Sequence, residues 1–518
     1  MRYISTRGLA PEVSSTEALL NGIAPDGGLY VPAEMPSAAA IAGALGDAGN
    51  YAETMRGVLS LFFDDVPAEV RAAAVARSVA RFADPAAPVA LRAASDGDAR
   101  VHFLDLTRGP TGAFKDVALT LLPTLLQYAA EQAGLKKAAV LTATSGDTGS
   151  AAMRGFADVA GTGVLVFYPK TGTSEIQRRQ MVCCAGGNVG ACAIEGNFDD
   201  AQTAVKAVFA DEKLRAAAAA KGVFLSSANS INIGRLFPQV CYYLEAWRAL
   251  REAGTLGAAG FDVVVPTGNF GNVLAAFYAK KLGAPIRRFV VASNANNVVA
   301  EFIATGVYDV NFHAGTSLPR AFAVTNSPSM DILVSSNVER FVFEVSGRDA
   351  ACVRACMASL KSGGKFALDG AALDGLKNAG FASGFADPAQ TEAAVGEAWK
   401  RFRNLIDPHT AIGLRALREL REREAENGGA AAVVAETATP WKFPRTVLSA
   451  LRGVGEDVPA PAEDEFENLR ALAAFAGKQP QGANLEARFG ELENAPELHG
   501  MSCAKDRVGE AVRAFFGI

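Results

Sequence analysis

The sequence predicts an α/β protein whose mainly parallel, twisted sheets are covered by helices on both faces. Short, almost continuously apolar runs alternate with segments whose apolar residues recur at helical spacing; the runs include KKAAVLTAT, GVLVFYP and FDVVVPT. Strands that are apolar on both faces are typical of parallel sheets buried between layers of helices. Ligands of such sheets bind beyond the carboxyl ends of the strands, where the glycine-rich loops of this chain fall.

Composition excludes several broad classes of function. The chain has 518 residues and a net charge of −5, with acidic and basic residues mixed along its length. A nucleic-acid surface needs a basic excess on one face, so we expect a small-molecule ligand and no nucleic-acid partner. No apolar run reaches the roughly 18 residues of a membrane helix, and the start lacks the apolar core of a signal peptide. The seven cysteines and four histidines form no metal pattern, so we expect a cytoplasmic protein with reduced thiols and no bound metal.

Changes in pattern divide the chain into three parts. Residues 1–95 form a predicted N-terminal domain, with a PDGG turn, a short LYVP strand and alanine-rich helices. Residues 96–450 carry the alternating strands and helices, although 350–426 look entirely helical. Residues 451–518 form a C-terminal extension rich in proline, glutamate and alanine, with helical sequence near its end.

One lysine lies at a position suited to covalent chemistry. The segment DLTRGPTGAFKD places Lys115 after a glycine- and proline-containing loop and immediately before a long apolar helix. Partial burial at such a position lowers the pKa of the amine, as a Schiff-base lysine requires. Taken alone, the same pattern fits a solvated lysine at a helix start.

A second loop has the features of a phosphate site. The segment PTGNFGNV follows a strand and opens a helix, and Gly268 and Gly271 let its backbone bend. Free amides at a helix start bind phosphate with help from the helix dipole. The loop is neither a GxGxxG fingerprint nor a P-loop. The alternative is an ordinary tight turn between a strand and a helix.

Two further segments could bind anions. TSGDTGSAA opens a helix after a strand, and its amides would suit a carboxylate or a phosphate. Its hydroxyl and carboxylate side chains could equally be helix caps. SSANSINIGRLFPQ contains an arginine that could make charge-assisted bonds to an anion, or could lie on the surface. The candidate residues in these two segments are Ser145, Asp147, Thr148, Asn229, Ser230 and Arg235.

The last polar segments lie near the end of the core. VVAETATPWKF ends a strand with Thr437, whose hydroxyl could bond a ring nitrogen, although a helix cap before Pro440 would explain the same residues. DPHTAIG contains His409, which could be catalytic or could make a structural hydrogen bond. A recessed lysine, two helix starts suited to phosphate and loops along one sheet edge together indicate pyridoxal phosphate.

The motifs GPTGAFKD, SGDTG, SANSINIGR, TGNFGN and SPSMDILVSSNVER closely resemble those of the threonine synthases in their longer, bacterial and fungal form. APDGGLYVP resembles the N-terminal domain of that family, and the resemblance extends from about residue 1 to about residue 450. It implies fold type II of the pyridoxal-phosphate enzymes (the tryptophan-synthase-β-like family), with a core of two α/β subdomains and an added N-terminal α/β domain.

The resemblance also implies roles for individual residues. Lys115 would form the Schiff base with pyridoxal 5'-phosphate and shuttle protons, and Thr437 would bond the pyridine nitrogen. The cofactor phosphate would be surrounded by Gly268, Asn269, Phe270, Gly271 and Asn272. Substrate would be recognised by Ser145, Asp147, Thr148, Asn229, Ser230 and Arg235. One motif departs from the family, because TAHPAKF is TATPWKF here, with Thr439 in place of histidine and Trp441 in place of a small residue.

The implied reaction converts O-phospho-L-homoserine and water to L-threonine and phosphate, the last step of threonine biosynthesis. Two alternatives stay open at this point. One is another fold-type-II lyase, such as a threonine dehydratase or a phospho-lyase, which differs in whether it recognises a substrate phosphate. The other is a non-catalytic binding protein on the same fold, against which the presence of Lys115 argues. The sequence does not distinguish a monomer from a homodimer.

Overall fold

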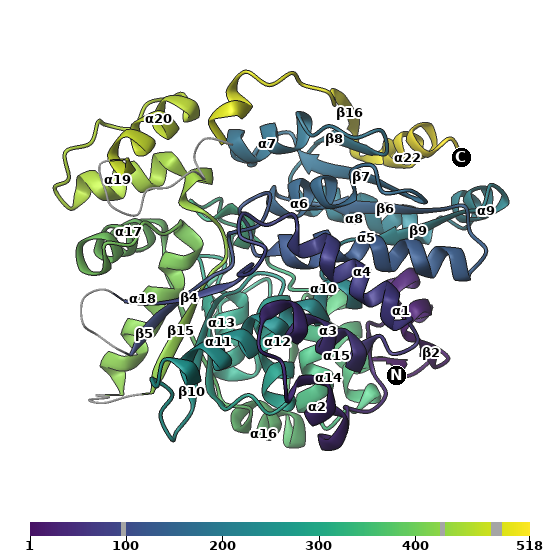
Figure 1. Cartoon of the computed structure of the whole chain (residues 1–518), viewed down its shortest axis with the longest axis horizontal. Helices are drawn as coiled ribbons and strands as arrows, with labels where there is room; N and C mark the ends of the chain where they lie inside the picture. The colour runs from purple at the N-terminus through teal and green to yellow at the C-terminus, as the bar shows by residue number, and fades with distance from the viewer. Residues whose placement is uncertain (95–99, 425–429, 478–488) are drawn as a thin grey trace.

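Two largely parallel sheets form the centre of the molecule, in agreement with the predicted fold class (Figure 1). The structure is a computed structural model and describes residues 1–94, 100–424, 430–477 and 489–518. The larger sheet has six strands in the order β14-β11-β10-β15-β5-β4, and only β4 is antiparallel to its neighbour. Its strands are β4 (Ala90–Ala93), β5 (Val101–Asp105), β10 (Phe261–Pro266), β11 (Ile286–Ser293), β14 (Phe381–Phe385) and β15 (Ala431–Glu436).

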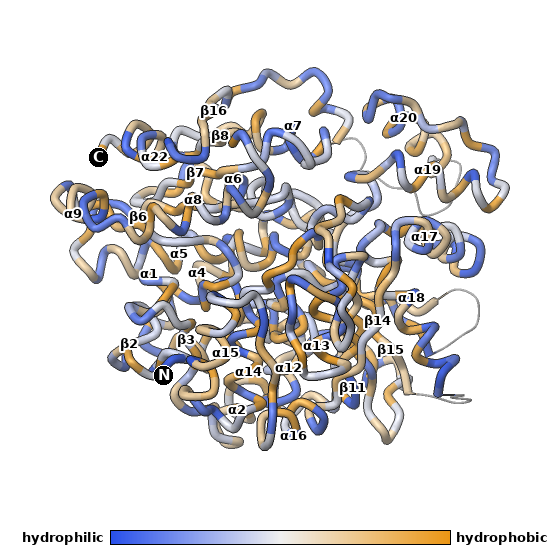
Figure 2. Tube along the Cα trace, turned by 180° about the vertical axis from the view of Figure 1, so that it is seen from behind, coloured by the Kyte–Doolittle hydropathy of each residue, from blue (hydrophilic) through white to orange (hydrophobic). Residues whose placement is uncertain are grey.

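The smaller sheet has five parallel strands in the order β16-β8-β7-β6-β9. Its strands are β6 (Lys137–Ala143), β7 (Thr162–Pro169), β8 (Val189–Glu195), β9 (Val223–Ser227) and β16 (Met501–Ala504). Every residue of β7 and of β10 is buried, which explains why the sequences of these two strands are almost continuously apolar. Figure 2 shows hydrophobic colour along the inner strands and a mixture of hydrophilic and hydrophobic colour on outlying helices such as α9 (Glu212–Ala220) and α20 (Glu465–Ala476).

Helices cover both sheets and connect their strands. Around the smaller sheet lie α5 (Lys115–Gln132), α6 (Asp147–Phe156), α7 (Glu175–Val182), α8 (Phe198–Ala210) and α22 (Val508–Phe516). Around the larger sheet lie α10 (Ile233–Leu236), α11 (Val240–Glu252), α12 (Gly271–Lys281), α13 (Val298–Thr305), α17 (Pro388–Phe402), α18 (Pro408–Arg423) and α19 (Pro444–Gly453). In the part of the chain that the structure describes, no helix is long and apolar enough to cross a bilayer.

The first residues form a small antiparallel sheet that packs against the core. It contains β1 (Arg2–Ser5), β2 (Val13–Ser14) and β3 (Tyr30–Pro32), with α1 (Ser15–Asn21) between β2 and β3. The helices α2 (Ala38–Leu45), α3 (Tyr51–Phe62) and α4 (Ala68–Val79) follow. Arg7 donates two hydrogen bonds to Glu339 of α14 (Val338–Val345), and Thr6 donates a third. The N-terminal residues are therefore tied to a helix of the core. The division at residues 95 and 450 stays a prediction.

The expectation that residues 350–426 are entirely helical is wrong. Between α15 (Ala350–Gly363) and α17 lie β13 (Lys365–Ala367), α16 (Gly370–Asn378) and β14. β13 pairs with β12 (Val307–Asp309), and β14 is the edge strand of the larger sheet. The C-terminal extension also contains an unexpected strand, β16. Both edge strands are short and only partly buried, so they lack the apolar run that marks the inner strands.

Candidate active site

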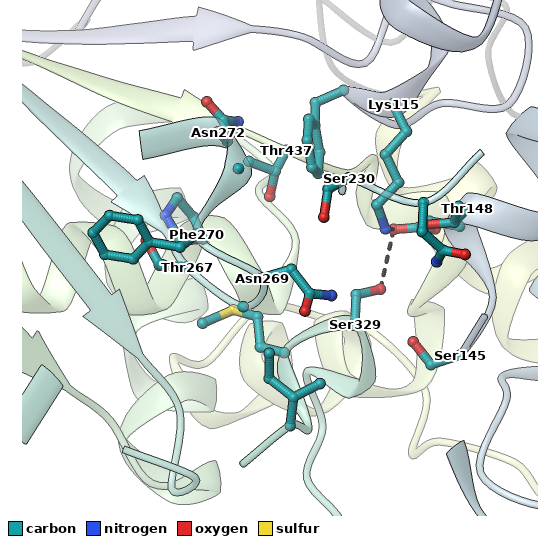
Figure 3. Close-up of a pocket in the computed structure, with 18 of the residues that line it drawn as sticks. Lys115, Ser145, Thr148, Ser230, Thr267, Asn269, Phe270, Asn272, Ser329 and Thr437 are labelled. Atoms are coloured by element: carbon teal, nitrogen blue, oxygen red, sulfur yellow. Dashed lines mark hydrogen bonds and ion pairs between the residues drawn. The ribbon is translucent and has the colours of Figure 1, made fainter. Parts of the chain in front are cut away.

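The carboxyl ends of strands from both sheets border one pocket. The loops after β5, β6, β9, β10 and β15 all contribute to it, as the position of the glycine-rich loops predicted. Every predicted site residue lines this pocket: Lys115, Ser145, Asp147, Thr148, Asn229, Ser230, Arg235, Gly268, Asn269, Phe270, Gly271, Asn272 and Thr437. Figure 3 shows Lys115, Ser230, Asn269 and Ser329 directed toward the same space.

Lys115 is the first residue of α5, and 12% of its side chain is exposed. Tyr242 donates a hydrogen bond to the carbonyl of Phe114, and the amide of Phe114 donates to the carbonyl of Thr437 at 2.9 Å. These bonds fix the backbone immediately before the lysine. Burial lowers the pKa of Lys115, an effect that the carboxylate of Asp147 partly opposes. Lys115 therefore loses its proton to form the neutral amine more easily than a solvated lysine does.

The carboxylate of Asp147 is held by several donors. Its oxygens accept hydrogen bonds from Lys115, Lys442, Gln177 and Ser329, over 2.8–3.3 Å. Burial alone would raise the pKa of Asp147, but Lys115 and Lys442 hold that pKa well below its usual range. Gly146 precedes it with a φ of +148°, and a Cβ there would lie 2.5 Å from Gln177. Glycine is therefore required where this helix start meets α7.

The loop after β10 has the geometry of an anion site. Phe270 has a φ of +62°, and α12 begins at the next residue, so the first amides of α12 have no partner within the helix. The Asn272 side chain accepts a hydrogen bond from Tyr243, and its buried amide nitrogen Nδ2 has no partner. An unpartnered buried donor beside free helix amides fits the phosphate of pyridoxal phosphate. The ring of Phe270 packs on Phe341, at a centroid distance of 4.9 Å, so only its backbone is available to a ligand.

Arg235 is a buried cation that forms no ion pair with a carboxylate of the described residues. It lies on α10 and is 2% exposed, and its guanidinium donates to the carbonyl of Ala228 at 2.5 Å. Its Nε is buried and unpartnered. Burial lowers the pKa of Arg235 to about 10, so the side chain remains charged at neutral pH. A buried positive charge that lines a pocket and has an unpartnered N–H donor, here Nε, is suited to binding an anionic ligand.

A second buried arginine supports the loop that carries Asn229 and Ser230. Arg340 donates to the carbonyls of Ser230 and Ile231, at 3.3 and 2.6 Å, and to that of Tyr30 in the N-terminal sheet at 2.9 Å. It also holds Asn337, whose amide donates to Ser230 Oγ at 3.1 Å and to the Asn269 carbonyl at 3.0 Å. The two predicted anion loops are therefore linked to each other and to the N-terminal sheet.

Sequence reasoning missed Lys442, Gln177 and Ser329 as neighbours of Lys115. Each contacts Asp147 from a different part of the chain. Lys442 and Ser329 lie within the motifs TATPWKF and SPSMDILVSSNVER, but these motifs alone do not show that either residue meets Asp147. His409 also lines the pocket, where its Nδ1 lies 2.5 Å from Asp407 and its Nε2 accepts from the Ser329 amide at 3.2 Å. These two bonds make it a support for the Ser329 loop.

Family comparisons agree along almost the whole chain. Residues 2–79 match the model described as threonine synthase N terminus, 86–376 that of pyridoxal-phosphate dependent enzymes, and 410–481 that of threonine synthase, C-terminal. Threonine synthase of Methylobacillus glycogenes is 38% identical over 459 residues, which cover 87% of this chain and 92% of the relative. Threonine synthase of Pseudomonas aeruginosa is 37% identical over 481 residues, which cover 90% and 94%.

Solved structures show the same relationship. The pyridoxal-phosphate-bound threonine synthase of Brucella melitensis is 35% identical, with a TM-score of 0.81 and 99% of each chain covered. Yeast threonine synthase is 27% identical, with a TM-score of 0.82 and coverage of 100% of this chain and 99% of that one. Sequence identity, domain content and fold therefore agree, and this chain belongs to the threonine synthase family of pyridoxal-phosphate-dependent enzymes.

Proposed function

We propose that this enzyme converts O-phospho-L-homoserine and water to L-threonine and phosphate at the pocket around Lys115. The observation that carries the proposal is the presence of two sets of anion donors in one pocket, beside a lysine of lowered pKa. One is the start of α12 with Asn272, and the other is Arg235 with Asn229 and Ser230. A cofactor phosphate and a substrate phosphate require two such sets.

The cofactor phosphate would be held by the backbone of residues 268–272 and by the unpartnered Nδ2 of Asn272. Thr437 directly follows β15 and lines the same pocket, so its hydroxyl would bond the ring nitrogen. Lys115 would form the covalent link. Pyridoxal phosphate supplies an electron-accepting ring, which makes the α proton of a bound amino acid acidic.

Substrate would be oriented by groups on the other side of the pocket. The amides at the start of α6 would bind the substrate carboxylate, because the carboxylate of Asp147 is already engaged by donors. Thr148 and Ser145 lie beside these amides. Arg235, Asn229 and Ser230 would bind the substrate phosphate. Lys115, once free of the cofactor, would take the α proton and return protons later in the reaction, as its lowered pKa allows.

The purified enzyme should release phosphate and threonine in equal amounts from O-phospho-L-homoserine. The same preparation should be assayed with L-threonine and L-serine for 2-oxo acid formation, the product of a dehydratase. Deamination of these amino acids without any reaction of O-phospho-L-homoserine would contradict the proposal and favour a dehydratase.

Gly271→Val should weaken binding of pyridoxal phosphate by roughly tenfold or more, which corresponds to about 1.4 kcal/mol. A Cβ at Gly271 would lie 3.3 Å from the Cβ of Ser230 and 3.5 Å from the Asn337 side chain, so the larger valine would displace both anion loops. The measurement is a cofactor titration followed by visible absorbance. Gly453→Val is the matched control, because no atom lies within 4 Å of its added Cβ. If both variants bound the cofactor with equal affinity, the loop at Gly271 would be a structural turn with no role in binding the cofactor phosphate.

A further inference from the structure

Asp147 lies between two lysines that approach it from different elements. Lys115 Nζ is 3.3 Å from Oδ2, and Lys442 Nζ is 2.9 Å from Oδ1. Lys442 has no exposed side-chain surface, and Asp147 is 2% exposed. The proposed function uses Lys115 but assigns no role to Lys442. A fully buried lysine is rare unless it is paired, and here its recorded side-chain partner is the carboxylate that also binds Lys115.

The two lysines would have different roles during the reaction, if Lys115 acts as proposed above. Lys115 must lose its proton to work as a base. If it were the sole cation on Asp147, deprotonation would leave a buried carboxylate without a compensating charge, which is strongly unfavourable. Deprotonation would then be opposed, and the pKa of Lys115 would rise. A second, permanent cation on the same carboxylate removes this penalty.

The other charged groups around this pair do not supply that cation. Arg235 donates to the Ala228 carbonyl and has no recorded bond to Asp147. His409 accepts a hydrogen bond from the Ser329 amide at Nε2 and contacts Asp407 through Nδ1, so both ring nitrogens are engaged by groups other than Asp147. Asp116 is bonded to Thr111, and burial raises its pKa. Lys442 is therefore the cation in direct contact with Asp147 that the chemistry does not consume.

We propose that Lys442 is a positioning residue that keeps Asp147 paired while Lys115 gives up and takes back its proton. Backbone hydrogen bonds hold Lys442 in this position. Lys442 lies on the short helix η3 (Pro440–Lys442), which follows β15 after the loop that contains Thr437. Its amide donates to the carbonyl of Thr439, whose own amide donates to the carbonyl of Gly112 in the loop before Lys115. The same segment therefore fixes both Lys442 and the approach to Lys115.

The test measures the protonation of Lys115 directly, in the full-length chain freed of cofactor. Acetic anhydride acetylates the neutral amine, and peptide mass spectrometry gives the rate at Lys115 across a range of pH. In Lys442→Met, the midpoint of this profile should move up by about one pH unit or more, so labelling below the midpoint slows by about tenfold. Lys442→Arg keeps the charge and should retain the wild-type midpoint. Asp147→Asn should move the midpoint down, because Lys442 then faces Lys115 without the carboxylate between them.

Lys281→Met is the matched control. It also removes a lysine from a fully buried carboxylate, Glu344, but one that lies outside the pocket. It should lower thermal stability and leave the Lys115 profile unchanged. An unchanged profile in Lys442→Met, or shifts in the same direction in Lys442→Met and Asp147→Asn, would overturn the proposal and leave Lys442 a structural ion pair.

The labelling result is independent of the substrate assignment. A wild-type enzyme that formed no threonine would contradict the proposed function, while the shift in the Lys115 profile would still stand. In the cofactor-loaded enzyme, Lys442→Met should also move the acid limb of the kcat profile to higher pH, because Lys115 is a free amine only after substrate has bound. A fall in kcat at all pH values with an unmoved acid limb counts against the role proposed for Lys442.

Discussion

Lys115→Ala should abolish threonine formation, with kcat lowered by at least about 10³-fold, since it removes both the covalent link and the proton-transfer group. The visible absorbance that arises from the lysine–cofactor link should disappear. The fold should survive, because Asp147 keeps Lys442, Gln177 and Ser329 as partners. The measurements are steady-state kinetics, a visible spectrum and a thermal melt.

Two further comparisons make this result specific. Lys361→Ala, at an exposed position on α15, should behave as wild type. A small primary amine such as methylamine should restore part of the activity of Lys115→Ala, because the variant leaves space where the side chain was. Threonine formation near the wild-type rate in Lys115→Ala without added amine would rule out the assignment.

Arg235→Met should lower kcat/KM for O-phospho-L-homoserine by roughly one to three orders of magnitude. Methionine retains much of the buried volume but removes the charge. A charge-assisted hydrogen bond is worth about 1.5–3 kcal/mol, and each 1.36 kcal/mol corresponds to about tenfold in rate. Steady-state kinetics should be measured beside a cofactor titration, which we expect to be unchanged.

The effect should depend on the phosphate of the ligand. Inhibition by a phosphonate analogue of the substrate should weaken in Arg235→Met, whereas inhibition by L-homoserine, which has no phosphate, should not. If cofactor were lost while the remaining loaded enzyme kept its normal kcat/KM, Arg235 would belong to the cofactor site. The assignment of the substrate phosphate would then lose its main support.

Local sequence was sufficient to predict the inner strands and the loops at their carboxyl ends. The strand β10 and the loop after it show why, since a continuous apolar run and a glycine-containing helix start are both visible within a few residues. Lys115 was predicted from a loop that leads directly into an apolar helix, taken together with the other motifs, because the local pattern alone also fits a solvated lysine. The pocket could then be expected because parallel strands bring such loops to one edge.

The rest depends on contacts between distant segments. The pairing of Asp147 with Lys442 joins α6 to η3, and Gln177 and Ser329 reach the same carboxylate from two further places. Lys442 lies in the motif TATPWKF, but that motif alone does not show that its side chain is buried against Asp147. The strand β16 was missed because four partly exposed residues become a strand only when β8 is beside them. Such elements are determined by tertiary contacts and have no local signature.

The position of β15 in the larger sheet has a consequence for biosynthesis. It pairs with β10 on one side and with β5 on the other, yet it follows β10 by about 170 residues. At translation rates of about 5–20 residues per second, this separation corresponds to roughly 10–30 s during which the facing edges of β5 and β10 lack their shared partner. Unpaired edges are templates for association with other chains, so the nascent chain needs protection during that interval. The strand that completes the sheet also delivers Thr437 and Lys442, so the catalytic pocket is among the last parts of the molecule to form.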